Sequence, residues 1–176
     1  GKASERSLFT AGTEVRVVYD ASRGIAESYP AQIWALELHY KGSGFVDSPY
    51  TSVNDIDYLT MSIIEGSITP EGLTLEFIST ADRELIYGSF YALELSLDGR
   101  WYRLPYVYKG EGAIGWDDIA YIVPAQGSSQ WSTDWSWLYG SLAEGSYRII
   151  KDVYDNNGDG DSKTYYLAAE FTIPPV

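Results

Sequence analysis

The clearest metal-binding spacing in the chain is an acidic loop from Asp155 to Asp161. Its sequence, DNNGDGD, matches the first half of an EF-hand calcium loop, D-x-N-x-D-G. Side-chain oxygens at alternate positions could ligate the cation, namely those of Asp155, Asn157 and Asp159, and Asp161 or its carbonyl would complete the site. However, the twelfth position is Tyr166 instead of a bidentate Glu, and Asn, Asp and Gly are also what a hairpin loop prefers. The spacing therefore predicts either a weak calcium site or a plain turn.

Other catalytic constellations are weak. The only histidine, His39, cannot build a two-histidine metal site, and a chain without cysteine has no thiolate nucleophile or cysteine zinc site. A G-x-G-x-x-G match ends at Gly115, but Trp116 and two aspartates follow it, so we interpret it as a glycine-rich loop. Carboxylates are numerous enough for a two-carboxylate glycosidase, yet no pair stands out. We therefore predict a protein that is not an enzyme and has no cofactor besides weak calcium.

Length and charge narrow the class of partner. The chain has 176 residues, with 12 basic and 25 acidic side chains, a net charge of −13 and a pI near 4.3. There is no basic run to neutralise phosphates, so nucleic acid and anionic membrane surfaces are not expected partners. No apolar run approaches the roughly 18 residues that a membrane-spanning helix needs. The length fits one domain with an extension.

The strongest hydrophobic periodicity is two, which is typical of half-buried strands. Turn signals, such as Pro70-Glu71-Gly72 and Asp98-Gly99, separate the alternating segments. Short strands at this spacing predict an all-β antiparallel sandwich or barrel. The four clearest alternating segments are 59–63, 73–77, 91–97 and 167–173.

The first third of the chain is less regular. We place a domain boundary near Asp57, with an N-terminal extension at residues 1–57 and the main domain at 58–176. The extension is expected to be rich in strands, at 14–20 and at 33–40, although a helix is the alternative for the second segment. A piece below about 60 residues without disulfides is marginal alone, so we expect it to pack on the sandwich.

One hairpin can be read in register. A two-residue type I′ turn at Asp98-Gly99 would place Glu94 opposite Arg103, both facing outward as an opposite-charge pair. The same register puts Trp101 on the outer face. There it is either covered by the N-terminal segment or available to a ligand.

Three segments together carry a family resemblance. Residues 131–151 read WSTDWSWLYGSLAEGSYRIIK and contain L-x-x-G-x-Y from Leu142 to Tyr147, the pattern of a tyrosine corner, in which the hydroxyl bonds back to the preceding corner. With DGRWYRLPY at 98–106 and TYYLAAEFTI at 164–173, the chain resembles a bacterial immunoglobulin-like domain family over roughly residues 68–173. That family is known mainly from secreted and lipid-anchored proteins of Gram-positive bacteria. The resemblance implies an immunoglobulin-like antiparallel β-sandwich and no catalytic residues.

Our leading prediction is a non-enzymatic extracellular binding or spacer module of a bacterial cell-envelope or secreted protein. Its partner would be a protein or a carbohydrate at the cell surface, and an upstream cysteine outside this chain would carry any lipid anchor. The alternative is a carbohydrate-binding module that uses exposed tryptophans, with Trp101 and Trp131 as candidates. An unbroken strand would place Trp131, Trp135 and Trp137 on one face, where they form either a ligand platform or part of the core.

Overall fold

The chain folds as two compact units, Gly1–Phe45 and Val46–Val176, each described here by itself. In this computed structural model, the described residues are 15–19, 25–26, 32–33, 35–40, 46–108, 114–156 and 162–175. The division precedes the boundary predicted near Asp57, because a short strand at Val46–Asp47 already pairs with the second unit. Whether the first unit packs on the second stays a prediction.

The first unit contains two antiparallel pairs. Strand β1 (Val15–Tyr19) pairs with β4 (Ala35–Tyr40), and β2 (Ile25–Ala26) pairs with β3 (Gln32–Ile33). The strict alternation in residues 33–40 thus indicated a strand correctly, and the helical alternative is wrong.

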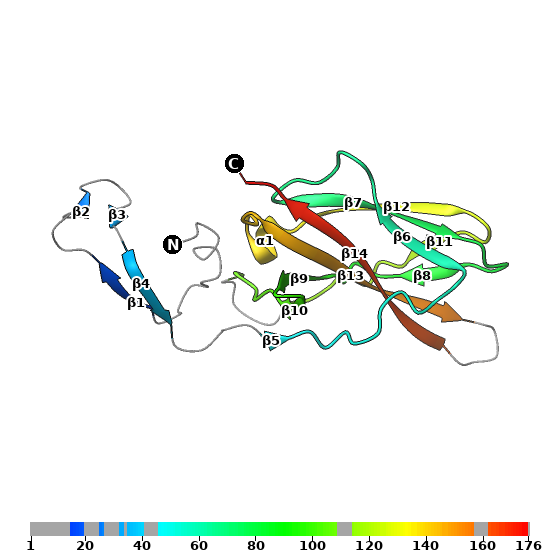
Figure 1. Cartoon of the computed structure of the whole chain (residues 1–176). Helices are drawn as coiled ribbons and strands as arrows, with labels where there is room; N and C mark the ends of the chain where they lie inside the picture. The colour runs from blue at the N-terminus through cyan, green and yellow to red at the C-terminus, as the bar shows by residue number, and fades with distance from the viewer. Residues whose placement is uncertain are drawn as a thin grey trace. The chain divides into compact units, whose positions relative to one another are not determined.

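The second unit is built from two antiparallel sheets (Figure 1). The smaller sheet has the order β12-β7-β6, and the larger has the order β11-β8-β13-β9-β10-β5, with β14 on the other edge of β13. The elements of this unit are β5 (Val46–Asp47), β6 (Leu59–Ile63), β7 (Gly72–Ser79), β8 (Leu85–Tyr87), β9 (Ala92–Leu97), β10 (Arg100–Arg103), β11 (Tyr121–Val123), β12 (Ser128–Asp134), α1 (Ser136–Tyr139), β13 (Gly145–Asn156) and β14 (Ser162–Ile173).

The core lies between the two sheets. On β7, inward Leu75 and Phe77 are fully buried, while the residues that alternate with them point outward and are more exposed. Across the interface, the Phe77 ring stacks on Tyr87 of β8 with 4.5 Å between centroids, and Ile149 of β13 is fully buried. The alternation that predicted half-buried strands therefore reflects two facing sheets, and the antiparallel β-sandwich is confirmed.

The predicted hairpin and the predicted corner both have the expected geometry. Asp98 and Gly99 have φ values of 50° and 76°, as a type I′ turn requires, and Glu94 lies opposite Arg103. Tyr147 is 4% exposed, and its hydroxyl donates to the Ala143 carbonyl at 2.9 Å. The tyrosine corner therefore fixes the entry into β13.

One prediction about this hairpin is wrong: Glu94 does not face solvent. It is completely buried and pairs with Arg148 of β13, at 2.7 Å, instead of with exposed Arg103. The reason is that the covering segment, residues 46–54, leaves the sheet edge after β5 and crosses this face, where Arg148 also contacts the Ser48 hydroxyl and the Tyr50 carbonyl. The residues that form the resulting apolar contact are Ala92, Ile150 and Ala168 of the sheet, packed against Tyr50, Val53 and Phe90.

Candidate binding surface

Four aromatic residues form a partly exposed cluster at one end of the sandwich, which we call the aromatic patch: Tyr106, Tyr108, Trp116 and Trp137. Trp137 is 47% exposed and lies between two edge-on neighbours, Tyr108 and Trp116, each with its ring centroid 6.1 Å away. Tyr106 and Tyr108 are 40% and 42% exposed. Large aromatic side chains with this exposure are the residue types that anchor binding partners.

A single helical turn creates the exposure of Trp137. Strand β12 ends at Asp134, and α1 begins at Ser136. The Asp134 Oδ1 accepts the Ser136 backbone N–H at 2.8 Å. Successive residues of a helix are rotated by about 100° around its axis. Residues two apart, which share a face in a strand, therefore point in different directions in a helix. Trp135 is fully buried and donates its indole N–H to the Pro70 carbonyl at 2.8 Å, whereas Trp137 points outward.

Two further segments supply the rest of the patch. After β10, the Val107 N–H donates to the Leu138 carbonyl of α1 at 2.8 Å, which places Tyr106 against buried Tyr139, 5.3 Å between centroids. Before β11, Trp116 packs edge-on against Tyr91 at 5.2 Å. The patch is therefore held from beneath by core aromatics.

One buried hydrogen bond stabilises this support. The Leu93 N–H donates to the Tyr139 hydroxyl at 3.1 Å, and burial raises the pKa of Tyr139 well above its usual range. Burial likewise raises the pKa of Tyr91 to about 12. Both phenols therefore stay neutral at physiological pH.

Those carboxylates are exposed. Asp117 and Asp118 directly follow Trp116, and Asp134 precedes α1. Hydrogen bonds from Ser136 lower the pKa of Asp134 below its usual range, so this carboxylate is ionised at neutral pH. Among the described residues, the charged side chains nearest in sequence to Trp116 and Trp137 are thus negative.

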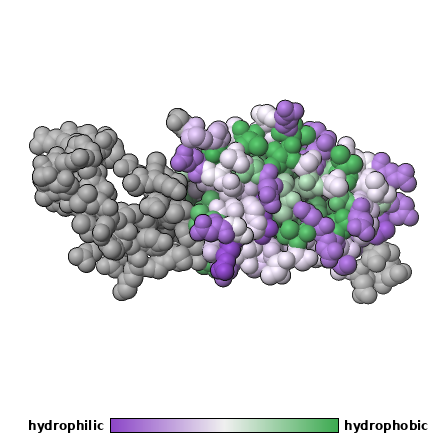
Figure 2. Space-filling view, viewed as in Figure 1, coloured by the Kyte–Doolittle hydropathy of each residue, from purple (hydrophilic) through white to green (hydrophobic). Residues whose placement is uncertain are grey.

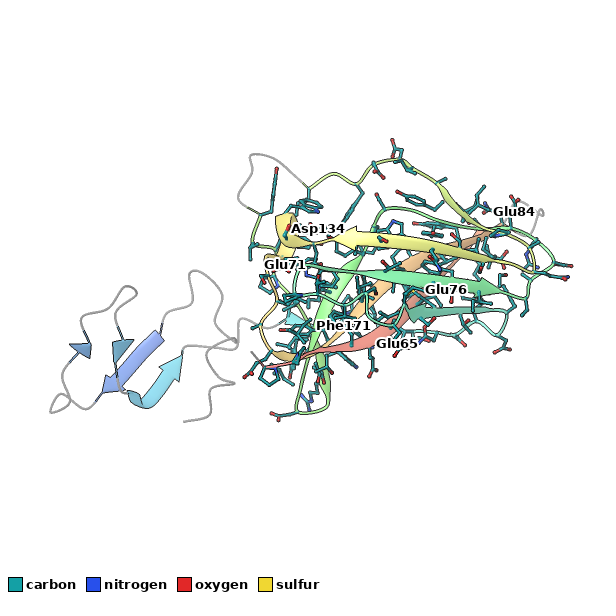
Figure 3. The ribbon with its side chains drawn as sticks, turned by 90° about the horizontal axis from the view of Figure 1, so that it is seen from above. Glu65, Glu71, Glu76, Glu84, Asp134 and Phe171 are labelled. Atoms are coloured by element: carbon teal, nitrogen blue, oxygen red, sulfur yellow. The ribbon has the colours of Figure 1, made fainter. Side chains whose placement is uncertain are left out.

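A shallow groove of about 260 Å³ lies beside Asp134, on the smaller sheet. Glu71 and Asp134 border it at the end of the sandwich that carries α1 (Figure 3). Most of its remaining lining is hydroxyl-bearing: Ser67, Thr69, Thr74, Ser132 and Thr133. Thr74 and Ser132 already bond each other at 2.8 Å.

Trp101, a candidate ligand residue, is half-buried on β10. The Arg148 guanidinium lies 4.5 Å from the centre of the Trp101 ring. The Trp101 carbonyl accepts the Ser48 N–H at 3.0 Å. One side of the ring is therefore occupied by a cation that the covering segment holds in place. A ligand at Trp101 stays a prediction.

Trp131, the other candidate, lies in the core. It is 8% exposed, and the Lys151 ammonium lies 4.0 Å from its ring centre. Lys151 is fully buried and donates to the Gly88 and Phe90 carbonyls at 2.5 and 2.6 Å. The expectation that Trp131 is exposed to a ligand is therefore corrected, because the ring serves as the wall of a buried lysine site.

Only the first two positions of the acidic loop, Asp155 and Asn156, are among the described residues. Both oxygens of Asp155 are engaged by Arg83, at 2.7 and 2.6 Å, and the Tyr58 hydroxyl donates to one of them. Asp155 is therefore not a free calcium ligand. The other three predicted ligands, Asn157, Asp159 and Asp161, lie outside the described residues, so calcium binding stays a prediction. Among the described residues, no three His, Asp or Glu lie together in a way that could hold a metal ion.

Three members of the patch were not predicted from the sequence: Tyr106, Tyr108 and Trp116. They lie in irregular segments, where no periodicity assigns a side chain to a face. On the visible face of the sandwich, hydrophobic and hydrophilic residues are mixed (Figure 2). The useful signal was the density of aromatic residues between Trp101 and Trp137.

The two-sheet antiparallel sandwich with its tyrosine corner defines an immunoglobulin-like domain. A family model described as "Bacterial Ig-like domain" matches residues 56–172, so the chain belongs to that family. Domains of this family are generally non-catalytic modules. No curated protein matches the chain. Among the described residues, no helix is long and apolar enough to cross a membrane.

Proposed function

We propose that this chain is a non-enzymatic binding module of a bacterial cell-envelope or secreted protein, and that the aromatic patch is its binding surface. The observation that supports this most is the position of Trp137. Trp131 and Trp135 are buried, whereas Trp137 is 47% exposed on α1, between two other aromatic rings. Exposing a tryptophan has no benefit for the fold, because burial of this side chain would stabilise the domain.

A protein partner fits the patch better than a sugar. The ring planes of Tyr108 and Trp116 are tilted by 82° and 71° against that of Trp137. These rings form an uneven, three-dimensional surface and not the flat row on which successive sugar rings stack. Uneven aromatic surfaces receive the protruding side chains of a protein partner.

A carbohydrate-binding module is the second candidate. The observation in its favour is the hydroxyl-lined groove beside Asp134, which could hydrogen-bond a sugar next to the exposed ring of Trp137. A spacer without a ligand is the remaining possibility for the same fold.

Parallel selections on the full chain would test the proposal. A displayed library of random peptides and a glycan array would be probed with the wild type, with Trp137→Ala and with Ile122→Ala. Ile122 is a matched control because it is 48% exposed on β11 and is not part of the patch. We expect peptides that bind the wild type and the control but not Trp137→Ala. Glycan binding that depends on Trp137 would favour the second candidate, and no Trp137-dependent binding would leave a spacer.

A further inference from the structure

The charge of the sandwich unit indicates the chemistry of the partner. Residues 46–176 carry seven basic and twenty acidic side chains, so this unit holds the whole net charge of −13. Four of the seven cations are held by contacts within the unit. Arg83 pairs with Asp155, Arg148 pairs with Glu94, Lys151 is enclosed in the core, and Lys163 lies 4.4 Å from the ring centre of Tyr165.

Negative charge also lies next to the aromatic patch. Exposed Asp117 and Asp118 follow Trp116, and ionised Asp134 lies three residues before Trp137. An exposed indole attracts a cation through the negative face of its ring, and a guanidinium both stacks on the ring and binds carboxylates. Electron-rich rings beside carboxylates therefore fit a cation with a flat, weakly hydrated head group.

We infer that the aromatic patch binds an arginine-bearing segment of a protein partner, with a guanidinium over Trp137 and the carboxylates of Asp117, Asp118 and Asp134 around it. This inference rests on the proposed function and names the partner class for the same surface. Trp101 shows the same chemistry within the fold, since the Arg148 guanidinium lies 4.5 Å above its ring while pairing with Glu94. The negative field of the unit would also speed the encounter with such a segment.

A pair of labelled peptides tests this inference with the full chain. One is a short peptide with two arginines separated by leucine, and its twin carries citrulline, which has a similar shape but no charge. Fluorescence anisotropy would give both affinities. We expect the arginine peptide to bind at least about two- to fivefold more tightly than the citrulline peptide. This preference should shrink when the NaCl concentration is raised from about 50 to about 500 mM.

Variants assign the effect to residues. Trp137→Ala should abolish binding of the arginine peptide, while Trp137→Phe, which keeps an aromatic ring, should retain part of it. The double variant Asp117→Asn/Asp118→Asn should lower the affinity for arginine but not for citrulline. Ile122→Ala, on β11, should change neither.

The outcomes separate the two claims. Equal affinity for both peptides, or no effect of the double variant, overturns the arginine assignment. In that case, library peptides that lose binding with Trp137→Ala would still support a binding surface at the patch. Failure of both peptides together with Trp137-dependent glycan binding overturns the protein partner as well.

Discussion

Arg148 and Glu94 form a buried ion pair on the sheet face that alternation assigned to solvent. The Arg148 Nε–H donates to Glu94 Oε2 at 2.7 Å, and Nη2 lies 2.7 Å from the same oxygen. Its remaining contacts are the Ser48 hydroxyl at 3.2 Å, the Tyr50 carbonyl at 3.4 Å and the ring of Trp101. Arg148 thereby ties the covering segment to three strands of the larger sheet.

Breaking this pair should strongly destabilise the domain. Arg148→Met leaves the fully buried Glu94 carboxylate without its cation, and we expect a loss of about 3–5 kcal/mol in the free energy of unfolding by urea. The double variant Glu94→Leu/Arg148→Met should lose less, because it leaves no uncompensated charge. Arg103→Gln, an exposed neighbour of the same hairpin, is the control and should stay within about 0.5 kcal/mol. A cost for Arg148→Met no larger than that of the control would contradict the account.

Removing the hydroxyl of Tyr147 should weaken the corner. Tyr147→Phe loses the bond to the Ala143 carbonyl and should cost about 0.5–1.5 kcal/mol in the same unfolding measurement. Gly145→Ala should also destabilise, since its new methyl group would lie 3.1 Å from the Tyr147 ring. A neutral Tyr147→Phe would show that the corner bond does not contribute.

Lys151 should make stability depend on pH between about 7 and 9. Burial lowers the pKa of Lys151 from 10.5 to about 7. In this window the unfolded chain keeps the lysine proton while the folded domain releases it, so stability should rise with pH, by up to about 1.4 kcal/mol per unit. Urea unfolding at several pH values would measure this slope. Lys151→Met should flatten it, and an equal slope in both proteins would show that another group titrates.

Asp155 should behave as a structural carboxylate. The hydrogen-bonded pair with Arg83 lowers the pKa of Asp155. The pair therefore stabilises the folded domain fully at a pH above the usual pKa of an aspartate, and this stabilisation is lost as the pH falls through the lowered pKa of Asp155. Asp155→Asn should lower the melting temperature, on the order of 5 °C, whereas Asp82→Asn, at an exposed partner of the same arginine, should have little effect.

The wild type and Asp155→Asn together also test the calcium prediction. Thermal melts of the wild type with millimolar calcium and with chelator should superimpose if Arg83 keeps Asp155. A rise in melting temperature with calcium that Asp155→Asn removes would show that the loop binds the cation and that Arg83 yields its partner.

Local chemistry made parts of this fold predictable. The Asp98-Gly99 turn and the Tyr147 corner depend on residues close in sequence, so the register of the hairpin and the corner bond followed directly from the chain. The partner of Glu94 did not, because the covering segment contains only two strand residues and its position depends on tertiary contacts. Trp137 was placed on a shared face with Trp131 because a four-residue helix is too short to leave a periodic signal.

The most direct test of the central claim is the dissociation constant of a selected peptide for three proteins: the wild type, Trp137→Ala and Ile122→Ala. If the aromatic patch is the binding surface, Trp137→Ala should weaken binding by at least about 2 kcal/mol, roughly thirtyfold, as expected for a tryptophan anchor. The Ile122→Ala control should match the wild type. Equal affinities for all three proteins would contradict a binding surface at Trp137.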